Sequence, residues 1–327
     1  MLTAAIDIGG TKTMVAAAVL REGAQKRLLG RYDIIGSETF ETAPRTQSLG
    51  ELLFKCTGIL ANMIRGKGYD AGELAGVGIS APGMVDAATQ RLIFAPGTGW
   101  RNADICAEIR KNFAALGADK NLFVRMDNDV NVCARAEAME GGLDNLFWMT
   151  VSTGIGGAFV VNGEVWGGAH SVAGEIGHLK VEYTKPRLCA CGQLGCAEAH
   201  CSGTAVGTMA KERAAVSPLL LARFREIGGE VDAKSCAELA GRGEPEALEI
   251  FGEAGMYLGR AVAAAVNLFD PAAVYIGGGM SRSLDLLLPH IKEQLALCTV
   301  STSAQTPVLP TALGYTAALH GAFSLML

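Results

Sequence analysis

Residues 2–20 have the sequence LTAAIDIGGTKTMVAAAVL, which predicts two apolar β-strands joined by a tight glycine turn. The strands cover residues 2–8 and 13–20, and Gly9 and Gly10 let the chain reverse between them. A glycine turn at a strand end exposes backbone N–H groups, which can bind phosphate oxygens without a side-chain charge. Close packing is the alternative explanation for a single turn of this kind.

The same strand–turn–strand pattern returns later in the chain. Residues 146–152 and 158–162 are expected to be strands, with a glycine turn at 153–157 between them. A third turn, at 277–279, follows a predicted strand at 274–276. Three such turns favour a nucleotide-binding site, although none matches the phosphate-binding P-loop or the dinucleotide-binding G-x-G-x-x-G pattern. The repetition indicates two related domains.

Helices and strands alternate along the rest of the chain, which is typical of an α/β protein. Helices are expected at residues 51–65, 103–116, 130–140, 203–215, 245–268 and 317–327, and further strands at 74–80 and 122–126. Asp129 is expected to cap the helix that begins at Val130. Residues 216–245 have no interpretable pattern.

Composition limits the class of protein. The 327 residues are 50% hydrophobic, which is enough for two domains with cores of their own. The net charge of −5 argues against a general nucleic-acid surface, so no nucleic-acid partner is expected. We find no apolar run of transmembrane length and no secretory signal. The sequence therefore predicts a soluble cytoplasmic protein with no membrane partner.

Three thiols and one imidazole lie close together in the sequence, at Cys189, Cys191, Cys196 and His178. A Cys₃His set suits a closed, tetrahedral structural Zn²⁺ site. Cys201 and His200 are the alternatives to His178 as the fourth ligand. A disulfide is disfavoured, because the number of cysteines is odd and no secretory signal accompanies them.

Seven motifs together resemble those of the ROK family (repressors, open reading frames and kinases), and they occur in the family's order. They are Asp7-Ile-Gly-Gly-Thr-Lys12, Ala81-Pro-Gly-Met-Val-Asp86, Asn128-Asp-Val-Asn131, Thr153-Gly-Ile-Gly-Gly157, Ala173-Gly-Glu-Ile-Gly-His178, Cys189–Glu198 and Ile276-Gly-Gly-Gly279. The resemblance covers nearly the whole chain. The zinc segment with the preceding Gly-Glu-Ile-Gly-His is its most specific part.

The resemblance implies a two-domain actin-like ATPase (ribonuclease H-like) fold, with sugar and ATP bound in a cleft between the domains. The expected domains are residues 1–125 with the C-terminal helix 313–327, and residues 126–312, which include the zinc-binding segment 178–196. The implied activity is ATP-dependent phosphorylation of a hexose, with glucose converted to glucose 6-phosphate. Hexose and ATP are the expected partners, Mg²⁺ and structural Zn²⁺ the metals, and a homodimer the expected assembly.

Roles for individual residues also follow from the resemblance. Asp129 matches the general base, and its place at a helix start predicts a low pKa; Asp127 is the nearby alternative. The sugar contacts matched are Gly83, Asn128, Glu175, His178 and Glu198. The nucleotide-side positions are Asp7, Gly9, Gly10, Thr11, Lys12, Thr153, Gly154, Gly277, Gly278 and Gly279, where Asp7 and Thr11 suit Mg²⁺. The metal ligands are His178, Cys189, Cys191 and Cys196.

Two departures from the family pattern bear on specificity. Gly97 stands where many glucokinases of this family have an Asn that contacts sugar, so relaxed selectivity among hexoses is expected. Tyr315-Thr316 replaces an acidic pair on the adenine side. Glu175 argues against the N-acetylmannosamine kinases, which have His there. N-acetylglucosamine, fructose, mannose or allose remain alternative substrates.

Two alternatives belong to another functional class. One is a sugar-sensing repressor, which would need a DNA-binding segment before the first glycine turn; only six residues precede Asp7. The other is a non-catalytic sugar-binding protein, against which the intact Asp129 argues.

Overall fold

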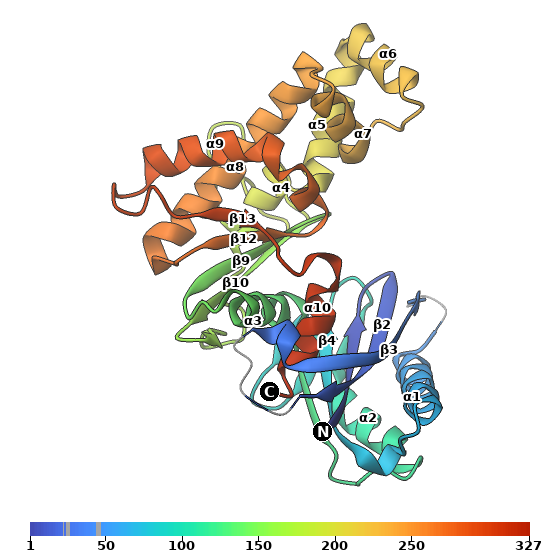
Figure 1. Ribbon diagram of the computed structural model, residues 1–327. Coiled ribbons are helices and arrows are strands. Elements are labelled where there is room, and N and C mark those ends of the chain that lie inside the picture. Colours follow the sequence, from blue (N-terminus) through green and yellow to red (C-terminus); the bar gives the residue numbers. More distant parts are fainter. Residues whose placement is uncertain (22, 24–26, 44–46) are drawn as a thin grey trace. The chain divides into compact units, whose positions relative to one another are not determined.

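The computed structural model describes all residues except 22, 24–26 and 44–46, and it divides the chain into two compact units (Figure 1). Unit 1 comprises Met1–Asp144, Phe159–Ala173 and Ala312–Leu327, and unit 2 comprises Asn145–Ala158 and Gly174–Thr311. The first unit therefore extends past the expected boundary at residue 125. The physical reason is the packing of helix α3 (Asp129–Gly141) on helix α10 (Ala317–Ser324).

Unit 1 is built on a five-stranded sheet in the order β3-β2-β1-β4-β8. Its strands are β1 (Leu2–Ile8), β2 (Lys12–Leu20), β3 (Tyr32–Glu41), β4 (Leu74–Ala81) and β8 (Phe123–Asn128). The predicted hairpin is confirmed, because β1 and β2 pair antiparallel around the first glycine turn. β4 is parallel to both β1 and β8, so the carboxyl ends of these three strands meet at one edge of the sheet.

Helices cover the unit 1 sheet. They are α1 (Leu49–Gly66) and α2 (Ile105–Ala114), with α3 and α10. Leu2, Ile6 and Ile8 of β1 share a buried cluster with residues of α1 and α2, whereas α10 contacts β1 and β4 closely. A Cβ atom at Gly78 of β4 would lie 1.8 Å from the carbonyl oxygen of Ala322 in α10. Only glycine permits this close approach of helix to strand.

A second, small sheet in unit 1 has the order β5-β6-β7 and was not anticipated from the sequence. Its antiparallel strands are β5 (Met84–Asp86), β6 (Arg91–Ala95) and β7 (Trp100–Ala103). Because Ala103 is the last residue of β7, α2 begins at Ile105 rather than at the expected residue 103. Short 3₁₀ turns, η1 (Leu28–Gly30) and η2 (Ala71–Glu73), complete the connections in this unit.

The strands of the other five-stranded sheet have the order β11-β10-β9-β12-β13, and most of it lies in unit 2. They are β9 (Leu146–Val151), β10 (Ile155–Val161), β11 (Glu164–Val165), β12 (Val274–Gly277) and β13 (Val308–Pro310). β9 and β13 each pair parallel with β12. The glycine turn predicted at 153–157 is shorter than expected, since β10 already begins at Ile155.

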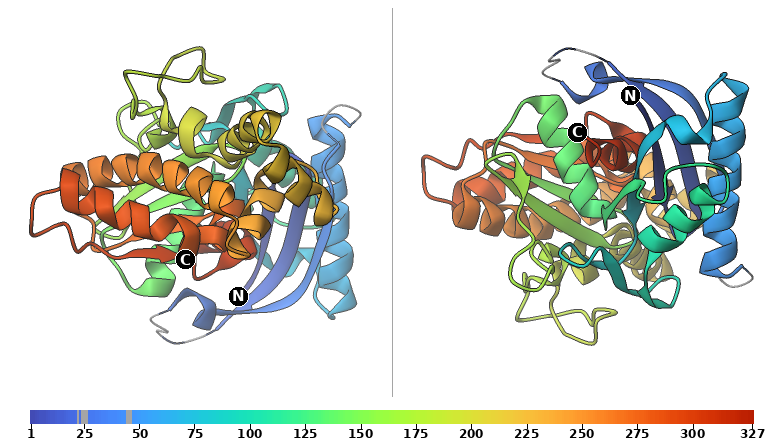
Figure 2. Two further views of the ribbon diagram at one scale, coloured as in Figure 1. Left: turned by 90° about the horizontal axis from the view of Figure 1, so that it is seen from above. Right: turned by 90° about the horizontal axis from the view of Figure 1, so that it is seen from below.

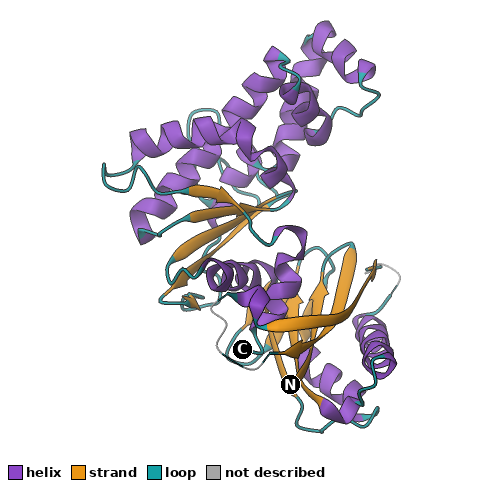
Figure 3. Cartoon of the chain, in the orientation of Figure 1, coloured by secondary structure: helices purple, strands orange, loops and turns teal. Residues whose placement is uncertain are grey.

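Unit 2 also contains six helices among its described residues (Figure 3). They are α4 (Ala197–Cys201), α5 (Gly203–Val216), α6 (Pro218–Glu226), α7 (Ala233–Gly241), α8 (Pro245–Phe269) and α9 (Leu284–Cys298). The 25-residue α8 lies beside α9, as both views in Figure 2 show. Residues 216–245, which the sequence left without a structure, contain α6 and α7. The 3₁₀ turns η3 (Ile176–His178), η4 (Gly279–Ser283) and, in unit 1, η5 (Gly314–Thr316) are short.

We looked for membrane-spanning segments among the described helices. None combines the length and the apolar character that crossing a bilayer requires.

Candidate functional site

In unit 1, the end of β8 and the start of α3 present Asp129. Asn128, and not Asp129 as expected, caps the helix: its Oδ1 accepts hydrogen bonds from the backbone N–H groups of Val130 and Asn131. Its amide also donates to Asp129 Oδ1 at 3.0 Å and to the carbonyl oxygen of Gly83 at 2.7 Å. Asn128 therefore fixes both the Asp129 carboxylate and the start of the small sheet.

The expected low pKa of Asp129 is wrong. Burial raises its pKa to about 6, and the hydrogen bonds from Val130 N and Asn128 only partly offset this desolvation. The partial positive charge at the start of α3 lowers the pKa of Asp129, but removal of the carboxylate from water raises it by more. A carboxylate with a pKa near neutrality suits proton acceptance.

Asp7 lies near Asp129 in the same unit, at the carboxyl end of β1. Burial raises the pKa of Asp7 to about 7, repulsion from Asp129 adds to the rise, and a hydrogen bond from Ser80 opposes it. Ser80 Oγ, fully buried on β4, donates to Asp7 Oδ1 at 2.8 Å. A group that is costly to ionise without a counter-charge suits a cation such as Mg²⁺.

Ser80 is a functional candidate that sequence reasoning missed. In the parallel sheet, Asp7 pairs with Ser80, and Ser80 pairs with Asp127 on the next strand. Strand ends that meet at one edge of a parallel sheet commonly form ligand sites. The signal in the sequence was a polar residue at the end of the apolar run 74–80.

Asp127, the alternative base, has a structural role. Its Oδ1 accepts from Asn131 Nδ2 at 2.9 Å and from the backbone N–H of Asn128 at 2.7 Å.

The first glycine turn is tight, since Gly9 N–H donates to the carbonyl oxygen of Lys12 at 2.9 Å. Gly10, Thr11 and Lys12 are exposed there.

In unit 2, Glu198 of α4 reaches the second glycine turn. Its Oε2 accepts from the backbone N–H of Ile155 at 2.9 Å, and a Cβ at Gly154 would lie 2.5 Å from the same oxygen. Thr204 Oγ1 donates to the carbonyl oxygen of Thr153 at 2.7 Å, and this bond ties α5 to the turn. The turn therefore brings Thr153 and Gly154, which are predicted on the nucleotide side, next to Glu198, which is predicted on the sugar side.

A cavity of about 420 Å³ opens beside this turn in unit 2. Its lining combines hydroxyl groups, one carboxylate and one guanidinium, and it consists of Thr153, Arg187, Leu188, Cys189, Ala190, Glu198, Ala199, Ser202, Thr204, Ala205 and Thr208. Convergent polar groups in a concave site are typical of a small-molecule pocket. Arg187 was not singled out from the sequence; its guanidinium makes a bidentate pair with Glu212.

The four proposed metal ligands, His178, Cys189, Cys191 and Cys196, converge in unit 2. One ligand atom from each lies within 4.8 Å of all the others. Cys191 Sγ and Cys196 Sγ are 3.7 Å apart, and Cys189 Sγ is 3.8 Å from His178 Nδ1. Zn–S bonds of about 2.3 Å in a tetrahedron place sulfurs about 3.8 Å apart, so the spacing fits Zn²⁺. Glu175 Oε2 lies 3.8 Å from the other ring nitrogen, Nε2, of His178.

His200 and Cys201, the alternative ligands, point elsewhere. The Nε2 of buried His200 accepts from the backbone N–H of Arg187, and its ring packs 4.5 Å from the ring of Tyr257. Cys201 Sγ donates to the carbonyl oxygen of Ala197 inside α4. Neither belongs to the group of converging ligand atoms.

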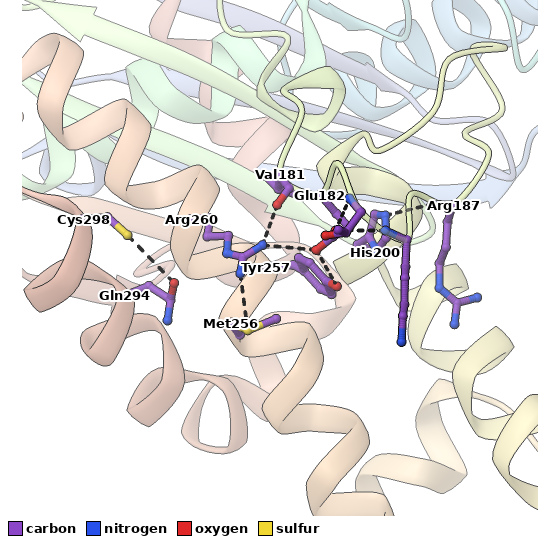
Figure 4. Close-up of polar contacts among 11 residues, drawn as sticks. Val181, Glu182, Arg187, His200, Met256, Tyr257, Arg260, Gln294 and Cys298 are labelled. Atoms are coloured by element: carbon purple, nitrogen blue, oxygen red, sulfur yellow. Dashed lines mark hydrogen bonds and ion pairs between the residues drawn. The ribbon is translucent and has the colours of Figure 1, made fainter.

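Glu182, near the start of the proposed zinc-binding segment 178–196, connects this segment to α8 (Figure 4). Its Oε2 accepts from the hydroxyl of Tyr257 at 3.2 Å and pairs with Arg260 at 3.4 Å, while Oε1 accepts from Thr184. These hydrogen bonds, those of the Thr184–Lys185 turn first, hold the pKa of Glu182 far below its usual range. These contacts hold the first part of the proposed zinc-binding segment against α8.

The third glycine turn follows β12. Gly278 has a φ of +78°, and a Cβ there would lie 2.5 Å from the carbonyl oxygen of Val151, so only glycine fits. Gly277 ends the strand and Gly279 begins η4. The proposed nucleotide-side glycines thus lie in both units: Gly9 and Gly10 in unit 1, the others in unit 2.

Comparisons with known proteins cover most of the chain. A sequence model described as "ROK family" matches residues 3–327. A glucokinase of Halalkalibacterium halodurans is 29% identical over 307 residues, covering 92% of this chain and 88% of that protein. The structure of a ROK family glucokinase from Streptomyces griseus, in complex with glucose and AMPPNP, shares 30% identity and 99% coverage of both chains, with a TM-score of 0.75. A xylose repressor of Bacillus subtilis matches 47% of this chain and 40% of its own length, with 30% identity.

Proposed function

This chain belongs to the ROK family, and from that premise we propose that it is an ATP-dependent hexose kinase that converts glucose to glucose 6-phosphate. The observation that carries the proposal is the pair of half-buried carboxylates, Asp7 and Asp129, which lie at the carboxyl end of β1 and directly after β8, the two strands that flank β4. A sugar-binding protein without catalysis has no need of a half-buried base with a near-neutral pKa.

In the proposed reaction, Asp129 accepts the proton of the sugar hydroxyl while the hydroxyl oxygen attacks the γ-phosphorus of ATP. A new O–P bond forms, the bond to the bridging oxygen breaks, and ADP leaves. Mg²⁺, which Asp7 and Thr11 would hold, supplies positive charge for the phosphate oxygens. The glycine turns donate backbone N–H groups to the same oxygens. Positioning contributes most, because this type of transition state needs little covalent help.

Gly83, Asn128, Glu175, His178 and Glu198 are proposed to hold the sugar. Carboxylates suit adjacent hydroxyl groups because they accept hydrogen bonds from both, whereas the His178 nitrogen that does not bind zinc carries a proton and donates to a sugar oxygen. Asn128 already caps α3 through its Oδ1, so its contact with sugar would use the amide Nδ2 that now reaches Gly83. The direct test is an ADP-release assay with a panel of hexoses, in which glucose should give the highest kcat/KM. No turnover of any hexose would contradict the proposal.

The rate should fall in acid. Because only ionised Asp129 accepts a proton and its pKa is about 6, kcat/KM for glucose should drop as the pH falls through 6. Between pH 7 and 8 the rate should level off as Asp7, whose pKa is about 7, also becomes ionised. A kcat/KM profile from pH 4.5 to 8 at saturating Mg·ATP measures this. A profile that stays flat down to pH 4.5 would exclude a base with this pKa.

The Cys₃His group is proposed to bind one structural Zn²⁺, and Lys180 to balance its charge. Three thiolates leave the loaded centre with one net negative charge. Lys180 Nζ lies 2.9 Å from Cys196 Sγ, where an ammonium stabilises the thiolate. Lys180→Met should therefore weaken zinc binding by about tenfold, measured by chelator competition, while Lys180→Arg should retain most of the affinity. Equal zinc affinities for Lys180→Met and the parent protein would refute this role.

The homodimer and the cytoplasmic location stay predictions from the sequence. Light scattering coupled to size-exclusion chromatography tests the first.

A further inference from the structure

A hollow of about 300 Å³ lies on unit 1, and the proposed reaction does not use it. It is lined by Met84, Asp86, Ile93, Ala169, His170 and Ser171, which come from β5, β6 and the loop after β11. We propose that this hollow is a subsite for a second, glycosidically linked hexose ring, so that the enzyme phosphorylates disaccharides as well as free hexoses. The inference rests on the proposed kinase function and extends its substrate class.

The hollow begins next to the proposed base. Met84 follows Gly83, whose carbonyl oxygen accepts from Asn128 Nδ2, and the same amide donates to Asp129 Oδ1. Gly83 has a φ of +89°, and a Cβ there would lie 2.3 Å from the carbonyl oxygen of Phe94. This contact fixes the path of β5 against β6. Asn128 thus links the proposed base to Gly83, the residue that precedes the first residue of the hollow.

The lining of the hollow suits a neutral sugar ring. Asp86 Oδ1 accepts from the backbone N–H groups of Ala88 and Thr89 at 2.9 and 3.2 Å, which fixes the carboxylate. The Thr89 side chain also hydrogen-bonds this carboxylate, whose two oxygens together can still accept from a sugar hydroxyl. Among the described residues no hydrogen bond uses the ring of His170, so the imidazole can also meet a hydroxyl group. The side chains of Met84 and Ile93 offer aliphatic surface to the C–H face of a pyranose.

The charge of the hollow disfavours an anionic ligand. The Thr89 side chain and the same backbone donors lower the pKa of Asp86, so the carboxylate is ionised at neutral pH. A phosphorylated sugar would bring a second negative charge close to it. Neutral hydroxyls therefore fit better than phosphate oxygens.

The loop that forms one wall is held in a strained conformation. Ser171 has a φ of +56°, a region that residues other than glycine occupy at a cost of about 1 kcal/mol. The loop is closed by a hydrogen bond from Ala173 N–H to the carbonyl oxygen of Gly167 at 3.2 Å. Local strain of this kind accumulates at ligand-binding loops, where the surrounding structure enforces a particular shape.

Matched pairs of sugars test the subsite. Maltose and cellobiose are compared with methyl α-glucoside and methyl β-glucoside, which carry the same first ring without the second. At least one disaccharide should exceed its methyl glucoside by tenfold or more in kcat/KM, and isothermal titration calorimetry should show the same advantage in binding. Ala169→Phe, which fills the hollow, should reduce this advantage at least tenfold. Val172→Phe places the same aromatic side chain on the same loop outside the hollow and should leave the advantage intact.

The two measurements separate this inference from the kinase proposal. If no sugar is phosphorylated but a disaccharide still binds better than its methyl glucoside, the kinase proposal fails and the subsite stands. If glucose is phosphorylated and neither disaccharide exceeds its methyl glucoside in rate or binding, the subsite is wrong. An equal loss in Ala169→Phe and Val172→Phe, with unchanged melting temperatures, would also overturn it.

Discussion

Asp129→Asn is expected to lower kcat for glucose by roughly 10²-fold or more, with little change in sugar affinity. The asparagine oxygen can still accept from Asn128 Nδ2 and from the backbone N–H of Val130, so the local structure is retained. What is lost is the group that accepts the proton. Steady-state kinetics give kcat, and calorimetric titration with glucose gives the affinity.

Asp127→Asn is the matched control, because it makes the same chemical change two residues away. Asp127 Oδ1 accepts from Asn131 and from the backbone of Asn128, and an asparagine oxygen can do the same. We expect a mild effect. The opposite pattern, with near-normal kcat in Asp129→Asn and none in Asp127→Asn, would assign the base to Asp127.

Cys191→Ser is expected to abolish stoichiometric zinc and to weaken sugar binding by at least about tenfold. The metal cluster adjoins the proposed sugar ligands: Cys189 Sγ lies 3.8 Å from His178 Nδ1 and 3.6 Å from Glu198 Oε1. Loss of the metal would release the loop that carries these groups. Elemental analysis should find about one zinc per chain in the parent protein. ATP affinity should change less than sugar affinity.

Cys298→Ser serves as the control for thiol loss, since Cys298 is also exposed but lies on α9 outside the cluster. It should keep its zinc and its sugar affinity. The zinc proposal would be abandoned if active protein, purified without chelators, contained no zinc.

Local features of this site were predictable from the sequence. The proposed metal ligands lie within a short segment, and the side chains of His178, Cys189, Cys191 and Cys196 converge in the structure. The first hairpin was equally local, since Leu2–Ile8 forms a strand with the predicted bounds. Two adjacent glycines between two apolar runs suffice to predict such a hairpin.

Segments whose structure depends on distant partners were not predictable. α6 and α7 are short helices, and they are stabilised by contacts with α5, with α8 and with each other rather than by any strong pattern of their own. β5, β6 and β7 pair only with one another in strands of three to five residues, too short to show an alternating pattern.

The sequence by itself determined which residues could do chemistry here: the glycine turns, the carboxylates and the thiol–imidazole set, all encoded within a few neighbouring positions. Only the tertiary structure decided how those groups behave. It brought Ser80 to Asp7 across 73 positions and made burial, not the helix start, set the pKa of Asp129. Short-range hydrogen bonding follows from neighbouring residues, but desolvation depends on every atom that excludes water, and those atoms come from distant parts of the chain.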